Sequence, residues 1–80
     1  MRFADMLREA RERAGLTQQA LAERTGLPLR SIQNWEQGHR VPRLPVLLAL
    51  ARALDARPER LLLALAEEQG PTNKRKGKRK

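Results

Sequence analysis

The stretch QQALAERTGLPLRSIQNWEQ, residues 18–37, determines the fold, because it has the pattern of two helices joined by a tight turn. Thr17 precedes it and offers a side-chain oxygen that can cap the first helix, which good helix formers continue as far as Arg24. Gly26 can adopt a left-handed backbone without a Cβ clash, so one helix can end there and the next can begin. The sequence therefore predicts a helix on each side of Gly26.

The helix after the turn has an apolar face of its own. Pro28 has no backbone N–H and a φ near the helical value, so it suits the first turn of a helix that we expect to reach Gln37. Ile32 and Trp35 are three residues apart and share one side of this helix. Ala22 is small enough to let the two helices approach closely. We expect four apolar side chains to face one core: Leu21, Leu27, Ile32 and Trp35.

Three further helices complete the predicted fold. The first has apolar residues at three- and four-residue spacing and ends at Gly15. Its apolar residues are Phe3, Met6, Leu7, Ala10 and Ala14. Residues 44–54, LPVLLALARAL, are apolar on nearly every side, which is typical of a helix buried in a bundle. Pro58 begins a last helix that reaches about Glu68, with an apolar side formed by Leu61, Leu62 and Leu65. The predicted fold class is all-α, a compact five-helix bundle.

The charge distribution divides the chain into two parts. Six of the seventeen basic residues lie in residues 70–80, which contain no acidic residue, and residues 1–69 keep eleven basic and nine acidic side chains, a charge of only +2. All lysines are in the second part, whereas the first uses arginine alone. We expect a folded domain over residues 1–69 and a disordered basic tail over residues 70–80. Such a tail resembles an arm that adds phosphate contacts; a solubilising end or an RNA-binding segment is the alternative.

The composition argues against several classes of function. The 80-residue chain has no cysteine, a single histidine (His39), no cluster of metal ligands and no glycine-rich phosphate loop. We therefore expect no enzyme activity, no catalytic residue, no metal and no cofactor. The longest apolar run is far shorter than the roughly 20 residues that cross a membrane. We expect a cytoplasmic protein without a membrane partner.

Several short signatures occur in order along residues 7–62. They are L-T-Q at 16–18, L-A-x-x-T-G-L at 21–27, S-I-x-x-W-E-x-G at 31–38, proline at 42 and A-L-D at 53–55. With these signatures the stretch resembles the Cro/C1-type helix-turn-helix domain, or XRE family, of bacterial and phage DNA-binding regulators. The resemblance implies a lambda-repressor-like fold of five helices, with the third helix in the major groove of double-stranded DNA. Two features depart from the family: Pro28-Leu29 stands where a cap and a polar residue are common, and Arg43 stands where serine often caps the fourth helix.

By this resemblance, four positions on the third helix read bases: Leu29, Arg30, Gln33 and Asn34. Arg30 can form two hydrogen bonds with guanine O6 and N7, and Gln33 or Asn34 can pair with adenine N6 and N7. Leu29 can contact a thymine methyl group but cannot read a hydrogen-bonding pattern. The alternative for each is a side chain that is simply solvated.

Five further residues are expected to contact DNA phosphates without reading sequence: Gln18, Gln19, His39, Arg40 and Arg43. Gln18 begins the second helix, where free backbone donors and the positive end of the helix dipole can meet a phosphate, and Gln19 shares this position. The other three lie in or beside a loop expected to run along the opposite strand. An exposed side chain without a partner is again the alternative.

Arg11 and Glu36 are expected to be structural. In the family, an arginine of the first helix and a glutamate that closes the third commonly form a partly buried ion pair, and both residues stand at the matching positions. Trp35 is expected in the core rather than as a base-stacking platform.

These features predict a sequence-specific regulator of transcription, a repressor, that binds as a homodimer to a two-fold related operator and associates with the nucleoid when bound. Its half-sites would lie roughly 34–36 Å apart. Leu63, with part of residues 44–54, is the candidate dimer contact, and wider burial within the monomer is the alternative. An antitoxin with a toxin as protein partner also fits. A different class, an interaction module that binds protein or nucleic acid without reading sequence, is the remaining alternative.

Overall fold

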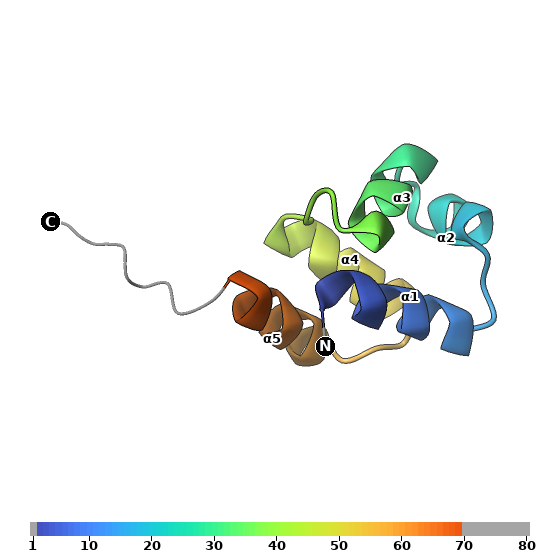
Figure 1. The fold of residues 1–80 in the computed structure, drawn as a ribbon. Helices are drawn as coiled ribbons and strands as arrows, with labels where there is room; N and C mark the ends of the chain where they lie inside the picture. Colours follow the sequence, from blue (N-terminus) through green and yellow to red (C-terminus); the bar gives the residue numbers. More distant parts are fainter. Residues whose placement is uncertain (1, 70–80) are drawn as a thin grey trace, which may run out of the picture.

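The computed structural model describes residues 2–69, and within them the chain forms five helices (Figure 1). They are α1 (Phe3–Arg13), α2 (Gln18–Thr25), α3 (Leu29–Gln37), α4 (Leu44–Ala53) and α5 (Pro58–Gln69). The first helix ends two residues before Gly15, and the other predicted ends fall within one residue of their positions, so the all-α, five-helix prediction is confirmed. The predicted disordered tail, residues 70–80, lies outside the described residues, and the domain boundary before it remains a prediction.

The turn between α2 and α3 has the predicted chemistry. The side-chain oxygen of Thr17 accepts a hydrogen bond from the N–H of Ala20 at 3.0 Å and caps α2. Gly26 ends α2 with φ +77°, in the left-handed region, and its N–H donates to the carbonyl of Ala22 at 2.8 Å. Pro28, expected in the first turn of the next helix, instead precedes α3 with an extended backbone, φ −63° and ψ 138°. Its fixed φ fits both positions, so the sequence could not distinguish them.

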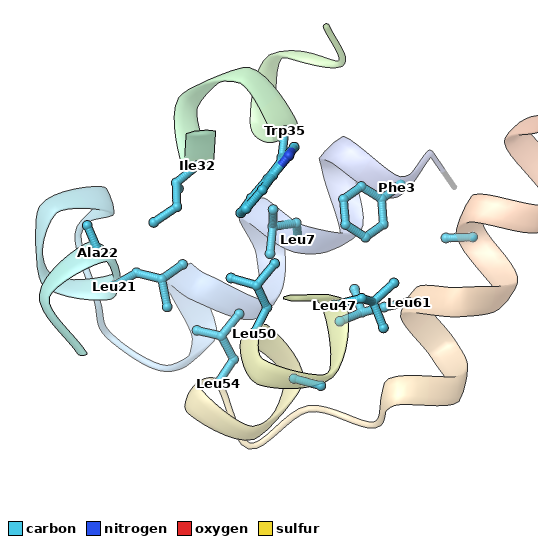
Figure 2. Close-up of a cluster of buried hydrophobic side chains, with 12 residues drawn as sticks. Phe3, Leu7, Leu21, Ala22, Ile32, Trp35, Leu47, Leu50, Leu54 and Leu61 are labelled. Carbon is cyan, nitrogen blue, oxygen red and sulfur yellow. The ribbon is translucent and has the colours of Figure 1, made fainter. Parts of the chain in front are cut away.

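All five helices contribute to one hydrophobic core (Figure 2). Its buried members are Phe3, Leu7, Leu21, Ala22, Ile32, Trp35, Leu47, Leu50, Ala51, Leu54, Leu61 and Ala64. Figure 2 shows Leu7 of α1 and Leu50 of α4 between Trp35 and Leu54. Leu27 is half-buried against this core. The predicted inward face of α2 and α3 is therefore confirmed.

Three expectations about burial were wrong: that α4 is buried on nearly every side, that Ala14 lies on the apolar face of α1, and that Leu62 lies on the apolar face of α5. Leu44 and Leu48 of α4 are 54% and 39% exposed, and Leu62 of α5 is 48% exposed. Ala14, expected on the apolar face of the first helix, is exposed after the helix has ended. The described chain packs α4 mainly against α2 and α5, so one side of this apolar helix has no neighbour to cover it.

A buried carboxylate joins α1 to α3. Glu36 is 5% exposed overall, and its Oε2 lies 2.6 Å from Nε of Arg11, whose Nη2 donates to Glu36 Oε1 at 3.1 Å. Arg11 also donates from Nη1 to the carbonyl of Leu16 at 2.8 Å. The hydrogen bond to Glu36 raises the pKa of Arg11, and burial acts in the opposite direction. The structure thus brings together the two residues expected to pair.

A second carboxylate holds the start of α1. Arg2 precedes the helix and its side chain makes no capping hydrogen bond. Instead Glu68, near the end of α5, accepts a hydrogen bond at Oε1 from the N–H of Phe3 at 2.9 Å. The first turn of the chain is therefore capped by its last described helix.

Two substitutions on α4 test which of its leucines are buried. Leu50→Ala removes a side chain with 0% exposure, and we expect it to lower the free energy of unfolding by about 2–5 kcal/mol. Leu48→Ala on the same helix should cost less than about 1.5 kcal/mol, because part of that side chain is already in water. Urea denaturation of dilute protein measures both. Similar losses would contradict the packing of α4.

The Arg11–Glu36 pair is tested by Glu36→Gln, with Asp5→Asn as the matched control. The first change leaves the Arg11 guanidinium, whose side chain is 12% exposed, without a compensating charge, and should cost about 2–3 kcal/mol of unfolding free energy. The second breaks the Arg8–Asp5 pair, in which both side chains are 44% exposed, and should cost less than about 1 kcal/mol. An unchanged melting temperature for Glu36→Gln would refute a stabilising role for the pair.

Candidate nucleic-acid interface

The core fixes which side of α3 faces outward. Ile32, Trp35 and Glu36 are buried. Arg30 and Asn34 are each two residues from Ile32, which turns them by roughly 200° around the helix axis, to its opposite side. Arg30 is exposed, and Asn34 is half-buried, as is Gln33. Arg30 and Asn34 therefore share the outward side of α3, and Gln33, about 100° from Ile32, lies at its edge. This part of α3 lies with α2 at one side of the domain (Figure 1).

Leu29 occupies a different position from the other three. Its side chain is half-buried and packs against the core cluster. It lies three residues before Ile32 and so turns partly toward the same side of α3. The Leu29 side chain therefore lies partly against the core and partly at the outer surface. Its role in reading bases remains a prediction.

The two glutamines at the start of α2 are held by carboxylates. Gln18 donates from Nε2 to Glu36 Oε1 at 3.1 Å, and Gln19 donates from Nε2 to Glu23 Oε2 at 3.2 Å. Neither hydrogen bond was predicted from the sequence. Both bonds orient the amide groups. In the first turn of α2 the N–H of Ala20 is capped by Thr17, whereas the N–H groups of Gln18 and Gln19 have no intrahelical acceptor and can meet an anion.

The loop after α3 is tied back to that helix. Gly38, with φ +82°, ends α3, and the N–H groups of His39 and Arg40 both donate to the carbonyl of Asn34, at 2.9 and 3.4 Å. His39 and Arg40 are exposed beside the end of α3, and so is Arg43, which precedes α4. Arg43 makes no side-chain capping bond to α4, consistent with its departure from the expected serine. The structure thus places these three basic side chains along one loop.

The charge around α3 favours a polyanion. Residues 26–43 carry three arginines and a histidine, against Glu36 as the single acidic residue. Glu36 is paired with Arg11 in the interior, so it does not oppose the exposed positive groups. This surface is basic although the charge of residues 1–69 is small.

One further residue of the same surface, Gln37, was not predicted from the sequence. Gln37 is exposed at the end of α3, three residues after Asn34 and seven after Arg30, so it continues their line along the helix. That spacing is visible in the sequence, but Gln37 lies at the C-terminal end of α3, whereas the side chains at the N-terminal end reach furthest into a major groove. In the described part of the chain, no three histidine, cysteine or acidic side chains are arranged to hold a metal ion. None of the described helices has the length and apolar character needed to span a membrane.

Comparison with known proteins identifies the class of this site. A family model described as helix-turn-helix matches residues 7–61. The restriction-modification controller protein C.AhdI from Aeromonas hydrophila is 41% identical, with a TM-score of 0.69 over 74% of this chain and 89% of that one. The P22 c2 repressor, solved in complex with synthetic operator 9T in the presence of Tl+, is 30% identical, with a TM-score of 0.73 over 80% of this chain and 97% of that one. Comparison with curated proteins gives no match.

The family model covers more than half of the chain, and its limits nearly coincide with residues 7–62, where the resemblance was seen. Both structural matches have more than two thirds of their length covered. The resemblance inferred from the signatures is confirmed: the chain belongs to the Cro/C1-type helix-turn-helix family of DNA-binding transcriptional regulators.

Proposed function

We propose that this regulator represses transcription by placing α3 in the major groove of a specific double-stranded operator. The observation that carries the proposal is the outward position of Arg30 and Asn34, opposite the buried Ile32. The P22 c2 repressor, which was solved with an operator and is covered over 97% of its length, supports the same use of the fold. Membership of this family makes the protein a regulator and not an enzyme, as expected from its composition.

The side chains of α3 are suited to different bases. Arg30 is the best suited to guanine, since its fork matches O6 and N7, and Gln33 or Asn34 suits adenine. A good bidentate pair discriminates against a wrong base by roughly 1–3 kcal/mol. Leu29 adds an apolar contact with a thymine methyl group through the part of its side chain that is not packed against the core.

Phosphate contacts on both sides of α3 set its position in the groove. On one side are the free N–H groups at the start of α2, where Gln18 and Gln19 lie. On the other are His39, Arg40 and Arg43 in the loop that is bonded to the end of α3. These contacts fix register and orientation but carry no sequence information. The activity belongs in the cytoplasm, where bacterial DNA lies.

We further propose that the protein acts as a homodimer on a two-fold related operator. Five large apolar side chains remain exposed at 39–58%: Val41, Leu44, Leu48, Leu62 and Leu63. Leu44 and Leu48 are four residues apart on one side of α4, and Leu63 is the most exposed of the five. Because α4 packs against α5, pairing two copies through these leucines would cover the apolar surface that the monomer leaves in water.

The role of Arg30 is tested by selecting binding sites from randomised DNA at about 150 mM salt, where nonspecific attraction is weak. The intact chain should enrich one two-fold symmetric motif. Arg30→Ala should relax one position in each half-site and weaken binding by roughly 1–3 kcal/mol, because it removes a contact with one base.

Arg60→Ala is the control for this experiment, because it removes the same charge from an exposed residue of α5. It should leave the motif unchanged. If the intact chain enriches no motif, the result supports the alternative, an interaction module that does not read sequence. If Arg30→Ala leaves every position as sharp as before, Arg30 is not a base-reading residue.

The dimer is tested by sedimentation velocity of the free protein at tens of micromolar, roughly the upper end of weak association. The intact chain should sediment as a dimer. Leu63→Lys should shift it to a monomer, because a charge at a desolvated interface costs several kcal/mol. Ala14→Lys adds the same charge at the exposed end of α1 and should leave the dimer intact. If the intact chain sediments as a monomer, the protein does not dimerise in the absence of DNA. A toxin or another protein would then be the better candidate for the partner that covers the exposed leucines.

A further inference from the structure

A groove on another side of the domain is not used by the proposed DNA interface. It has a volume of about 380 Å³ and is formed by α1, the connection between α4 and α5, and the first turn of α5. In Figure 1 this connection runs on the side of α1 opposite α3. A molecule in the groove would therefore leave the outward side of α3 free. The volume lies within the range of about 300–1,000 Å³ that is usual for small-molecule sites.

The floor of the groove is apolar. Met6 and Ala10 of α1, Ala56 of the connection and Leu61 of α5 line it. Leu61 is buried, and the other three are half-buried against the core. This lining offers a rigid contact for a ring or a short hydrocarbon chain.

The rim of the groove is charged. Arg13, Arg57 and Arg60 lie on it together with Glu9 and Asp55, and all five are exposed. Among residues 2–69, the ion pairs within 4.0 Å join Arg8 to Asp5 and Arg11 to Glu36, so no rim group is neutralised by a direct pair. Three positive and two negative groups leave an excess of one positive charge.

We propose that this groove binds a small amphipathic monoanion, with its apolar body on the floor and its carboxylate among the rim arginines. Guanidinium groups match carboxylates in geometry and charge, and they bind them more strongly than neutral acceptors. The two rim carboxylates disfavour a second negative charge, so a phosphate dianion or a nucleotide fits less well. The proposal is independent of the DNA-binding function, because it uses none of the α3 residues.

The test compares phenylpropionate with phenylpropionamide, which has the same ring and chain but no charge. Each is titrated into the full chain labelled with nitrogen-15, and the backbone amide signals are followed by NMR. Phenylpropionate should give saturable shifts at Ala10, Ala56 and Leu61, with a Kd on the order of 1 mM for a ligand of this size. Phenylpropionamide should bind about tenfold more weakly. The place of the shifts is decisive, because the basic residues after Gly70 attract any anion.

Two arginine variants complete the test. Arg57→Gln and Arg60→Gln should each raise the Kd of phenylpropionate about two- to fivefold, the effect of losing one solvent-exposed ion pair. Arg52→Gln removes the same charge from an exposed residue of α4 that does not line the groove and should leave the Kd unchanged. The proposal fails if the groove signals do not saturate, if the acid and the amide bind equally, or if the three variants behave alike.

Discussion

The geometry of this domain depends on one buried carboxylate. Glu36 accepts hydrogen bonds from Arg11 of α1 and from Gln18 at the start of α2, and it is itself part of α3. One side chain therefore connects α3, the helix proposed to enter the major groove of DNA, with α2 and with α1. A buried charge tolerates few alternative arrangements, because each movement of a helix would leave a donor or the carboxylate without a partner. The hydrophobic core holds α3 against the domain, whereas this polar cluster fixes its direction.

The boundaries of the helices could be predicted because they depend on local chemistry. Thr17 caps α2 with its own hydroxyl, and Gly26 provides the left-handed turn that no other residue adopts as easily. Burial was harder to predict wherever a helix is apolar on more than one side. Leu47 and Leu48 are both leucines in one run, yet one is fully buried and the other is not. The sequence of α4 cannot show which of its sides meets another helix, since that depends on how α2 and α5 are placed around it.

The outward side of α3 could be predicted because Arg30 and Asn34 have a fixed angular relation to Ile32, which agrees with the positions that the family resemblance implies. The hydrogen bonds of Gln18 and Gln19 could not be predicted, since a long polar side chain has several rotamers and the sequence gives no reason to choose one. Leu29 was expected only at the DNA side of α3, whereas the structure packs part of its side chain against the core. The groove beside α5 could not be foreseen at all, because residues from α1 and from the α4–α5 connection form it only after folding.

The hydrogen bond between Phe3 and Glu68 has a consequence for the way this domain can be joined to other proteins. It brings the first helix and the end of the last described helix together, at the part of the domain farthest from α2 (Figure 1). Residues 3 and 68 therefore form a natural junction, and a short peptide linker between them would close the chain into a ring. New ends could then be opened in the connection between α4 and α5, which contributes no residue to the proposed DNA interface. Because residues 3 and 68 lie side by side, the domain has the geometry required for insertion into a surface loop of a host protein.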